Sequence, residues 1–262
     1  MNRSFGRVYG WLLDSIAKKK GLAFLVVDPP NQSPEVAGRS AALAQEAGFD
    51  AIVVGGSVGA QGPLLEMTIS SIRQNSKLPV ILFPGNIATI SPQADAIYFM
   101  SLLNSTDPYY ISGAQIASSM PVKRLGLEVI PTSYVVVEPG RAVGWVGRAQ
   151  LIPRELPYLA AATALGGQFM GSLAVILESG GGAPSPAPVE MVATVRKMID
   201  VPLIVAGGVR TPEFAFQTIK AGADVVHIGS AIEKTNGDEK AALVLMKELA
   251  AAVRRGAAEK NH

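Results

Sequence analysis

The chain has 262 residues, of which 48% are hydrophobic and 17% are charged, and its formal net charge is +2. Because neither sign of charge dominates, the composition does not favour a nucleic acid or an anionic membrane as a partner. The chain contains no cysteine, which excludes disulfides, thiolate metal sites and cysteine nucleophiles. The length is close to the roughly 250 residues of one (β/α)8 barrel.

The first 20 residues predict a helix rather than a targeting segment. They lack the long apolar core and the small-residue cleavage site of a signal peptide. Val8, Trp11, Leu12 and Ile16 recur at helical spacing, so we expect an amphipathic helix over 1–20 that packs on the rest of the protein. No apolar run reaches the roughly 18–20 residues that a spanning helix needs, and we expect a cytoplasmic protein.

Short aliphatic and β-branched runs recur along the whole chain, and near-continuous apolar strands indicate a parallel sheet that is buried on both faces. Helical patterns lie between them, at 33–48, 186–200 and 212–222. Eight strand–helix units predict an α/β fold, a single (β/α)8 TIM-barrel domain over 1–262. An open doubly wound sheet is the alternative. The predicted strands are 22–28, 51–56, 79–85, 96–101, 127–138, 171–179, 202–208 and 225–230.

The third unit breaks this rhythm. About ten residues separate the third strand from the fourth, and Pro92 interrupts them, whereas a crossover with its helix normally takes at least 10–12 residues. We therefore expect the third helix of the barrel to be missing or reduced. The gap predicts an apolar groove for an elongated apolar ligand; a flat loop or a subunit contact over these strands is the other interpretation.

Glycines cluster where the last three strands turn into helices. Glycine lets the backbone approach a ligand closely, and N–H groups at these turns favour anions. In (β/α)8 barrels a phosphate commonly binds at the loops after strands seven and eight. Three such clusters favour a phosphorylated substrate over simple tight turns. They are Gly180, Gly181 and Gly182, then Gly207 and Gly208, then Gly229 and Ser230.

Polar residues at other strand ends are candidates for metal binding and acid–base chemistry. Asp28 ends the first strand and Ser57 the second, which makes a sparse oxygen site suited to Mg²⁺. Glu178 ends the sixth strand beside the glycines and could deprotonate a substrate hydroxyl; pairing with Arg210 is the alternative. Zinc is not favoured, because His227 lies within a predicted strand as a buried structural residue and His262 is the frayed C-terminus.

Eight motifs together resemble one family, the archaeal geranylgeranylglyceryl phosphate synthases, which are related to bacterial PcrB-type heptaprenylglyceryl phosphate synthases. The motifs follow one another over nearly the entire chain. "DAIYFMSLLNS" is the most specific of them, and its Ser101 and Asn104 are expected either to face the mouth of the barrel or to tie down a loop. The motifs are "VVDP" (26–29), "VVGGS" (53–57), "LFPGN" (82–86), "DAIYFMSLLNS" (95–105), "PYYISGAQ" (108–115), "EVIPTSYVVVEPG" (128–140), "LESGGG" (177–182) and "GGVRTPE" (207–213).

The resemblance implies a barrel without its third helix and transfer of a geranylgeranyl group from its diphosphate to the 3-hydroxyl of sn-glycerol 1-phosphate. Mg²⁺ is the implied cofactor, with Asp28 and Ser57 as its ligands, and Glu178 is the catalytic candidate. Tyr109, Tyr110 and Tyr134 are candidates for a prenyl groove; for Tyr109 and Tyr110 a purely structural role is the alternative. The implied glycerol-phosphate site consists of Ile176, Leu177, Glu178, Ser179, Gly180, Gly181, Gly182, Gly207, Gly208, Gly229 and Ser230.

The chain departs from the family pattern at three places. Ile176 stands where a tyrosine is usual, Ser179 to Gly182 replace the usual Ala-Gly-Ser-Gly, and Pro30-Asn31 replace a charged residue after "DP". Other readings are heptaprenylglyceryl phosphate synthesis, a phosphate-binding isomerase or aldolase, and a non-catalytic barrel that binds a prenyl diphosphate. We also expect a homo-oligomer, with Trp11, Trp145 and 140–156 as an interface, a lid or both.

Overall fold

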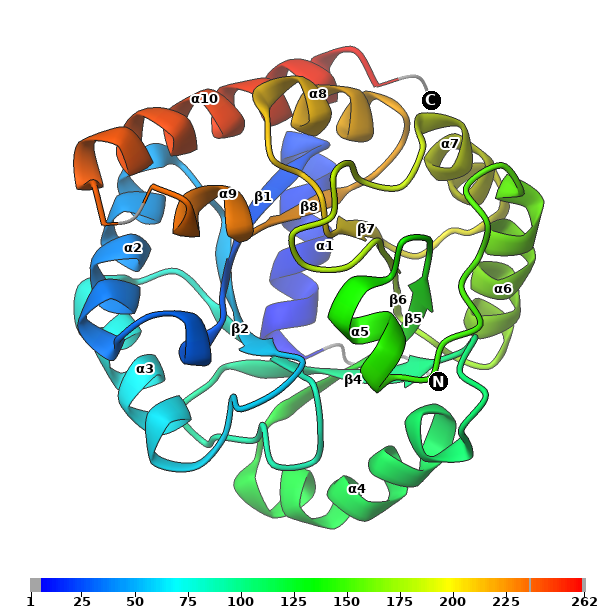
Figure 1. The fold of residues 1–262 in the computed structure, drawn as a ribbon, viewed down its shortest axis with the longest axis horizontal. Coiled ribbons are helices and arrows are strands. Elements are labelled where there is room, and N and C mark those ends of the chain that lie inside the picture. The colour runs from blue at the N-terminus through cyan, green and yellow to red at the C-terminus, as the bar shows by residue number, and fades with distance from the viewer. Residues whose placement is uncertain (1–5, 236, 261–262) are drawn as a thin grey trace.

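The computed structural model describes residues 6–235 and 237–260. Its eight parallel strands pair in chain order and close into a barrel, because β1 also pairs with β8 (Figure 1). The closed barrel confirms the predicted fold class and contradicts the doubly wound alternative. The strands are β1 (Leu22–Val27), β2 (Ala51–Gly56), β3 (Val80–Pro84), β4 (Ala96–Leu102), β5 (Glu128–Val136), β6 (Ala174–Glu178), β7 (Leu203–Ala206) and β8 (Val225–Ile228).

Helices surround the barrel, and in the described parts of the chain none is long and apolar enough to cross a membrane. The helices predicted at 33–48, 186–200 and 212–222 are present as α2, α7 and α8. The predicted frayed end at His262 lies outside the described residues, as does 1–5 of the predicted first helix. The α-helices are α1 (Arg7–Lys19), α2 (Pro34–Ala47), α3 (Gly62–Asn75), α4 (Ala114–Leu125), α5 (Arg141–Val146), α6 (Pro157–Phe169), α7 (Val189–Met198), α8 (Pro212–Lys220), α9 (Ser230–Glu233) and α10 (Glu239–Ala258).

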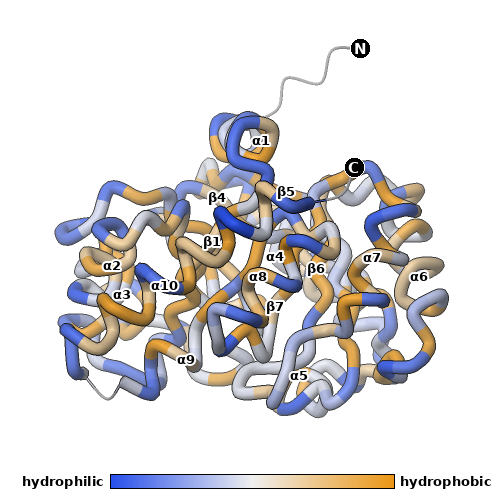
Figure 2. The backbone as a smooth tube through the Cα atoms, turned by 90° about the horizontal axis from the view of Figure 1, so that it is seen from above, coloured by the Kyte–Doolittle hydropathy of each residue, from blue (hydrophilic) through white to orange (hydrophobic). Residues whose placement is uncertain are grey.

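Helix α1 lies across the N-terminal end of the barrel, as Figure 2 shows. Leu12 is fully buried, and the ring of Trp11 stacks on Phe24 of β1 with 6.1 Å between ring centroids. The carboxylate of Glu128 accepts the backbone N–H groups of Val8 and Tyr9 in the first turn of α1, at 2.8 and 2.7 Å. The predicted packing of this helix is confirmed, and Glu128 acts at the end opposite the candidate site.

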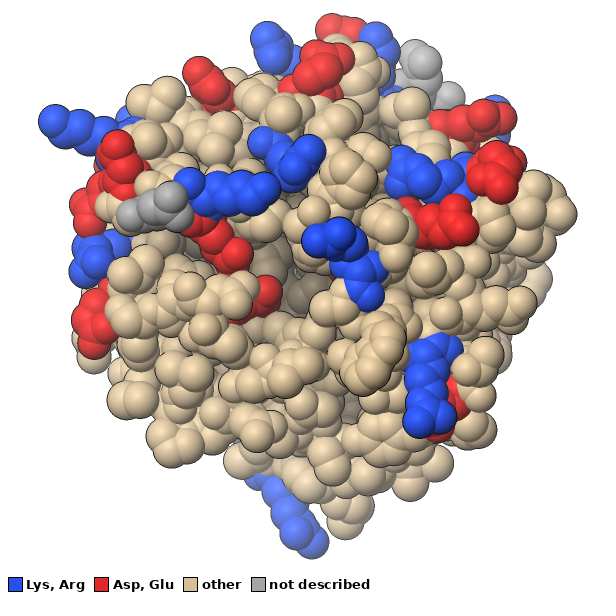
Figure 3. All heavy atoms as spheres, in the orientation of Figure 1, with Lys and Arg blue, Asp and Glu red and all other residues tan. Residues whose placement is uncertain are grey.

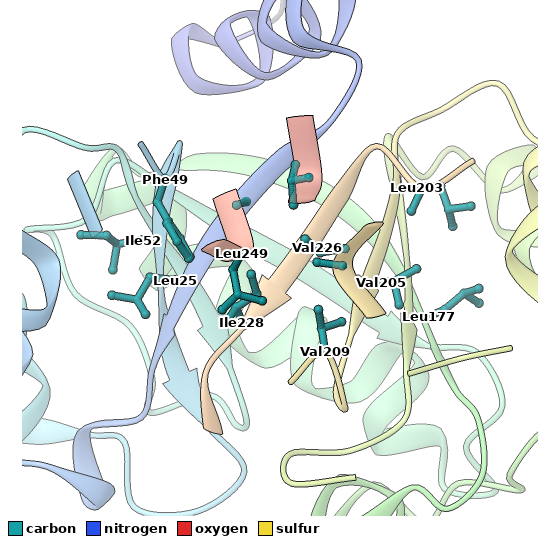
Figure 4. Close-up of a cluster of buried hydrophobic side chains, with 14 of the residues drawn as sticks. Leu25, Phe49, Ile52, Leu177, Leu203, Val205, Val209, Val226, Ile228 and Leu249 are labelled. Carbon is teal, nitrogen blue, oxygen red and sulfur yellow. The ribbon is translucent and has the colours of Figure 1, made fainter. Parts of the chain in front are cut away.

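Alternate residues of each strand point into the barrel and out toward the helices. On β1, Phe24 belongs to the inner core and Leu25 to the outer core. Figure 4 shows part of the outer core, where Leu25 and Ile228 lie near Leu249 of α10. Because both faces are buried, the strands read as continuous apolar runs in the sequence.

Three aspartates hold the N-terminal end of the barrel together. Asp50, Asp95 and Asp224 stand directly before β2, β4 and β8, and each accepts a backbone N–H from the preceding strand at 2.8–2.9 Å. Each carboxylate also pairs with two basic side chains, so its charge is satisfied where it is largely removed from water. The partners are Lys19 and Arg254 for Asp50, Arg7 and Arg73 for Asp95, and Arg196 and Lys260 for Asp224.

We expect Asp224→Asn to lower the free energy of unfolding by about 3 kcal/mol, because it leaves Arg196 and Lys260 without their buried counter-charge. Urea unfolding monitored by circular dichroism measures the change. Glu259→Gln is the matched control, since its ion pair with Lys220 is solvent-exposed and is worth less than about 1 kcal/mol. Equal destabilisation by both substitutions would contradict this role for Asp224.

The connection from β3 to β4 contains no helix, as predicted. Residues 85–95 form turns and bends, and α3 and α4 flank the opening in the helical layer (Figure 1). Ile97 and Phe99, which point outward from β4, therefore lack the helix that would normally cover them. This missing cover shapes the cavity described below.

The polar residues of the "FMSLLNS" motif tie down loops. Ser101 Oγ donates to the carbonyl oxygen of Ile111 at 2.6 Å. Asn104 Nδ2 donates to the carbonyl oxygens of Val136 and Gln150, both at 2.8 Å, and its Oδ1 accepts the N–H of Val136. Of the two expected roles, the structure therefore supports the second: these side chains fix the segments after β4 and β5.

Candidate active site

A cavity of about 520 Å³ opens at the C-terminal end of the barrel and receives residues from all eight strand ends. Figure 3 shows the hollow in this face, with acidic side chains at one side of it. Both faces of β4 line the cavity: Tyr98 and Met100 from the inside, Ile97 and Phe99 from the outside. The cavity thus continues from the barrel interior into the space that the missing helix leaves.

Most of the predicted phosphate-site residues meet at one side of this cavity. Gly181 and Gly182 follow β6, Gly207 and Gly208 follow β7, and Gly229 and Ser230 follow β8, and all six line it. Gly207 has a φ of +74° and a Cβ there would clash with Oε1 of Glu178, so only glycine fits. The loops after β6, β7 and β8 therefore bring residues with small or no side chains together at one wall of the cavity.

Four residues of the implied glycerol-phosphate segment do not line the cavity. Ile176 points into the inner core and Leu177 into the outer core, and both are fully buried. Ser179 is buried, and its Oγ lacks a hydrogen-bond partner among the described residues. Gly180 packs against Gly140 and Arg141 at the start of α5.

Glu178 is almost completely buried at the end of β6, where its carboxylate lines the cavity. The hydroxyl of Tyr134 donates to Oε2 at 3.0 Å, and the N–H of Gly180 donates to Oε1 at 2.6 Å. Burial raises the pKa of Glu178 to about 7, and the charge of Asp28 adds to the rise. A carboxyl group with a pKa near neutrality is suited to accept a proton.

Two neighbours of Glu178 differ from expectation. Arg210 does not pair with it; Nη2 of Arg210 donates to the carbonyl oxygen of Pro184 at 2.8 Å. This contradicts the alternative in which Glu178 is an ion-pair partner. Tyr134, a candidate for the prenyl groove, lines the cavity with its hydroxyl on Glu178, and burial raises its pKa well above the ordinary value.

Asp28 and Ser57, the candidate metal ligands, both line the cavity at the ends of β1 and β2. A Cβ on Gly56 would lie 3.4 Å from Oδ1 of Asp28, so this carboxylate reaches toward β2. Burial raises the pKa of Asp28 to about 7, with a further contribution from Glu233. A buried carboxylate beside a second acid is a favourable place for a cation.

Sequence reasoning missed Glu233, which belongs to α9 and lines the same side of the cavity as Asp28. The signal was present, because Glu233 comes four residues after Gly229 in the last glycine cluster. Asn31 Nδ2 lies 3.4 Å from Oε1 of Glu233 and joins the two loops. Among the residues that the structure describes, no group of three or more His, Cys, Asp or Glu side chains could hold a metal.

Apolar side chains line the part of the cavity that extends toward the missing helix. The rings of Tyr109 and Tyr110 lie edge to face, with 5.1 Å between centroids, and both line this part. Both rings thus line the cavity, and that a prenyl group binds beside them stays a prediction. Other apolar residues that line the cavity are Ile87, Ile90, Ile97, Phe99, Val143 and Val146.

His227 is buried, as predicted, and lies at the floor of the cavity. Its ring packs edge-on against Phe83, with 5.4 Å between centroids, and its Nε2 lies 3.5 Å from the hydroxyl of Tyr98. Burial lowers its pKa to about 3, so the imidazole is neutral at pH 7. A neutral, buried ring does not supply positive charge to an anionic ligand.

The PcrB family model matches residues 14–248 of this chain. Geranylgeranylglyceryl phosphate synthase of Pyrococcus horikoshii is 53% identical over 236 residues, which cover 90% of this chain and 92% of that protein. The synthase of Thermococcus kodakarensis is 51% identical over 236 residues, 90% of this chain and 93% of its own length.

Solved structures show the same relationship. Wild-type geranylgeranylglyceryl phosphate synthase (GGGPS) from Thermoplasma volcanium superposes with a TM-score of 0.90 at 37% identity, and the match covers 94% of this chain and 97% of that one. The Thermoplasma acidophilum enzyme, solved with sn-glycerol-1-phosphate, gives a TM-score of 0.88 at 36% identity over 93% and 98% of the two chains. Together with the family match, these similarities show that the chain belongs to the PcrB family.

Proposed function

We propose that this protein transfers the geranylgeranyl group of geranylgeranyl diphosphate to the 3-hydroxyl of sn-glycerol 1-phosphate and releases diphosphate. This would form the first ether bond of an archaeal membrane lipid. One observation carries the proposal: a single cavity joins a glycine-lined polar wall with a buried carboxylate to an apolar groove. Relatives that are named for this reaction, at 50% identity or more, favour it over heptaprenyl transfer.

Glycerol phosphate would bind at the glycine-lined wall, with its phosphate against the loops after β6, β7 and β8. Its hydroxyl end would then reach Glu178. As the glycerol oxygen forms a bond to the allylic carbon, its proton passes to Glu178 and the C–O bond to diphosphate breaks with its electron pair. Tyr134 and Gly180 hold the carboxylate in position for this transfer. Orientation of two bound substrates supplies a large part of the rate.

The residues at the other side of the cavity fit Mg²⁺. Asp28 has no hydrogen bond or ion pair to its carboxylate in the described structure, and its raised pKa indicates a site short of positive charge. Mg²⁺ often binds one or two carboxylates and completes its shell with water and substrate phosphate. Asp28 and Ser57 would hold the ion, which when bound stabilises the negative charge of the leaving diphosphate.

The prenyl tail would lie in the apolar groove beside β4. Tyr109 and Tyr110 line it at the level of the missing helix, and α5 covers the mouth through Val143 and Val146. An aldolase that works through a Schiff base would require a lysine in the cavity, and none of the lining residues in the described chain is a lysine. The predicted cytoplasmic location and homo-oligomer stay predictions.

The test is diphosphate release from geranylgeranyl diphosphate and sn-glycerol 1-phosphate, with and without Mg²⁺. We expect release that requires both substrates and the ion, and a lower rate with heptaprenyl diphosphate or with sn-glycerol 3-phosphate. Release only with heptaprenyl diphosphate would assign the bacterial-type reaction instead. Tight binding of both substrates without turnover would make the protein a non-catalytic binder.

A further inference from the structure

The lining of the cavity lacks positive charge. It includes three carboxylates, Asp28, Glu178 and Glu233, and among the described residues it includes no lysine and no arginine. Both substrates of the proposed function are anions, so the site needs cations beyond the glycine backbone. Mg²⁺ at Asp28 would serve the diphosphate. The phosphate of glycerol phosphate, at the glycine-lined wall, still lacks a cationic partner.

Arg141 stands next to this wall, at the start of α5. A Cβ on Gly180 would lie 2.6 Å from Cβ and 2.7 Å from Cγ of Arg141, so the arginine packs directly on the first glycine of the loop. The following residues of α5, Ala142 and Val143, line the cavity. Arg141 itself is exposed, and Figure 3 shows basic side chains around the hollow.

The other arginines near this wall already donate to protein oxygens. Arg154 donates to the carbonyl oxygens of Glu138 and Pro186 and to Ser185 Oγ, and Nη2 of Arg210 donates to the carbonyl oxygen of Pro184. The Nε of Arg210 has no partner among the described residues, but it is buried. These contacts shape the loop that follows β6. The guanidinium of Arg141 has no acceptor among the described residues, so its donors remain available for a ligand.

The backbone of Arg141 is also unusual. Its φ is +50°, and in the described chain only Lys20 and Arg148 share a positive φ outside glycine. Glycine would adopt this conformation at no steric cost, whereas a long side chain there is strained. The arginine therefore stands at a position whose backbone favours glycine, directly over the phosphate-binding loop.

We propose that Arg141 is a substrate-binding residue, whose guanidinium covers the phosphate of sn-glycerol 1-phosphate bound at Gly181 and Gly182. This inference rests on the proposed function and adds to it the cation that the cavity lining lacks. A guanidinium forms strong charge-assisted hydrogen bonds to phosphate oxygens. The flexible side chain would close over the phosphate once it is bound, and so also help to retain it.

Arg141→Gly tests the proposal, with Arg148→Gly as the matched control. Arg148 has a φ of +48° just after the other end of α5, but its Nε lies 3.8 Å from Oδ2 of Asp107, an acidic partner that Arg141 lacks among the described residues. Glycine removes the steric strain of the positive φ at both positions, so any effect of that relief on stability or activity is common to the two variants. We expect Arg141→Gly to raise the KM for sn-glycerol 1-phosphate about tenfold or more, with the KM for the prenyl diphosphate within about twofold.

Two further measurements complete the test. Calorimetric titration of sn-glycerol 1-phosphate alone should show the same loss of affinity, and Arg141→Lys should restore part of it. A variant that binds glycerol phosphate as wild type does, or an Arg148→Gly variant that loses the same affinity, would overturn the inference. A raised KM for the prenyl diphosphate instead would also overturn it. If wild type itself neither binds nor consumes glycerol phosphate, the proposed function fails, which is a different result.

Discussion

Glu178→Gln is expected to lower the rate of prenyl transfer by about 10²–10⁴-fold, because the amide cannot accept the proton of the glycerol hydroxyl. The substitution keeps the shape of the side chain. Its oxygen can still accept the N–H of Gly180, and its NH₂ group can donate to the hydroxyl of Tyr134. Binding of glycerol phosphate should therefore change much less than turnover.

The pH dependence of the wild-type reaction follows from the same group. Glu178 accepts a proton only when it is ionised, and burial raises its pKa to about 7. The rate should accordingly fall as pH drops below about 7. Asp28 also has a pKa of about 7 and interacts with Glu178, so the acid limb reports the two groups together.

Stability should respond to Glu178→Gln in the opposite sense to activity. Because the pKa rises from 4.5 to about 7 on folding, the native protein keeps a proton that the unfolded chain has released between these values. The stabilising contribution of this group is complete below pH 4.5 and is lost as pH rises through 7. At pH 8 the glutamine variant should thus be more stable than wild type, by on the order of 2–3 kcal/mol.

Single-turnover assays and urea unfolding at pH 5 and pH 8 measure both effects. Glu138→Gln is the control, since Glu138 follows the neighbouring strand β5 and does not line the cavity. Near-normal turnover in Glu178→Gln would eliminate Glu178 as the proton acceptor. A loss of stability at pH 8 would show instead that its ionised form is favoured by the fold.

Much of this architecture could be predicted from local patterns. The eight strands are continuous apolar runs because they are buried on both faces, and each run stops near its strand's end. The missing helix also has a local cause, since Pro92 and the short connection leave no room for one. A continuous apolar run does not show which of its side chains point into the barrel and which point toward the helices. Ile176 and Leu177 are both apolar and both fully buried, although one faces the barrel interior and the other the helices.

The sequence could not show contacts between residues that are far apart along the chain. Tyr134 and Glu178 are 44 residues apart and meet only because β5 and β6 pair in register. Arg141 reaches Gly180 because α5 folds back over the loop that follows β6. The segment 140–156 was expected to be a lid, an interface or both. Its helix α5 does cover the mouth of the cavity, and Trp145 on the same helix is 85% exposed.

Asp28→Asn carries the second large expected effect. We expect kcat/KM for the prenyl diphosphate to fall about 10²–10³-fold, because Asp28 is the main anionic ligand of the proposed Mg²⁺ site. Asparagine keeps one oxygen and the size of the side chain, so the cavity keeps its shape. The Mg²⁺ concentration that gives half-maximal rate should rise at least tenfold. The rate in excess Mg²⁺ should recover in part if the loss is one of metal affinity.

Metal binding itself separates this role from a structural one. Titration with Mn²⁺, followed by its electron paramagnetic resonance signal in the presence of diphosphate, should show weaker binding in Asp28→Asn and near-normal binding in Glu178→Gln. Asp28 is close enough to Glu178 to raise the pKa of Glu178, yet only Asp28 is expected to hold the ion. Ser57→Ala should give a smaller loss, since a neutral hydroxyl contributes less than a carboxylate. If Asp28→Asn binds Mn²⁺ as wild type does, the cation lies elsewhere, and Glu233 is then the remaining carboxylate of the cavity that could bind it.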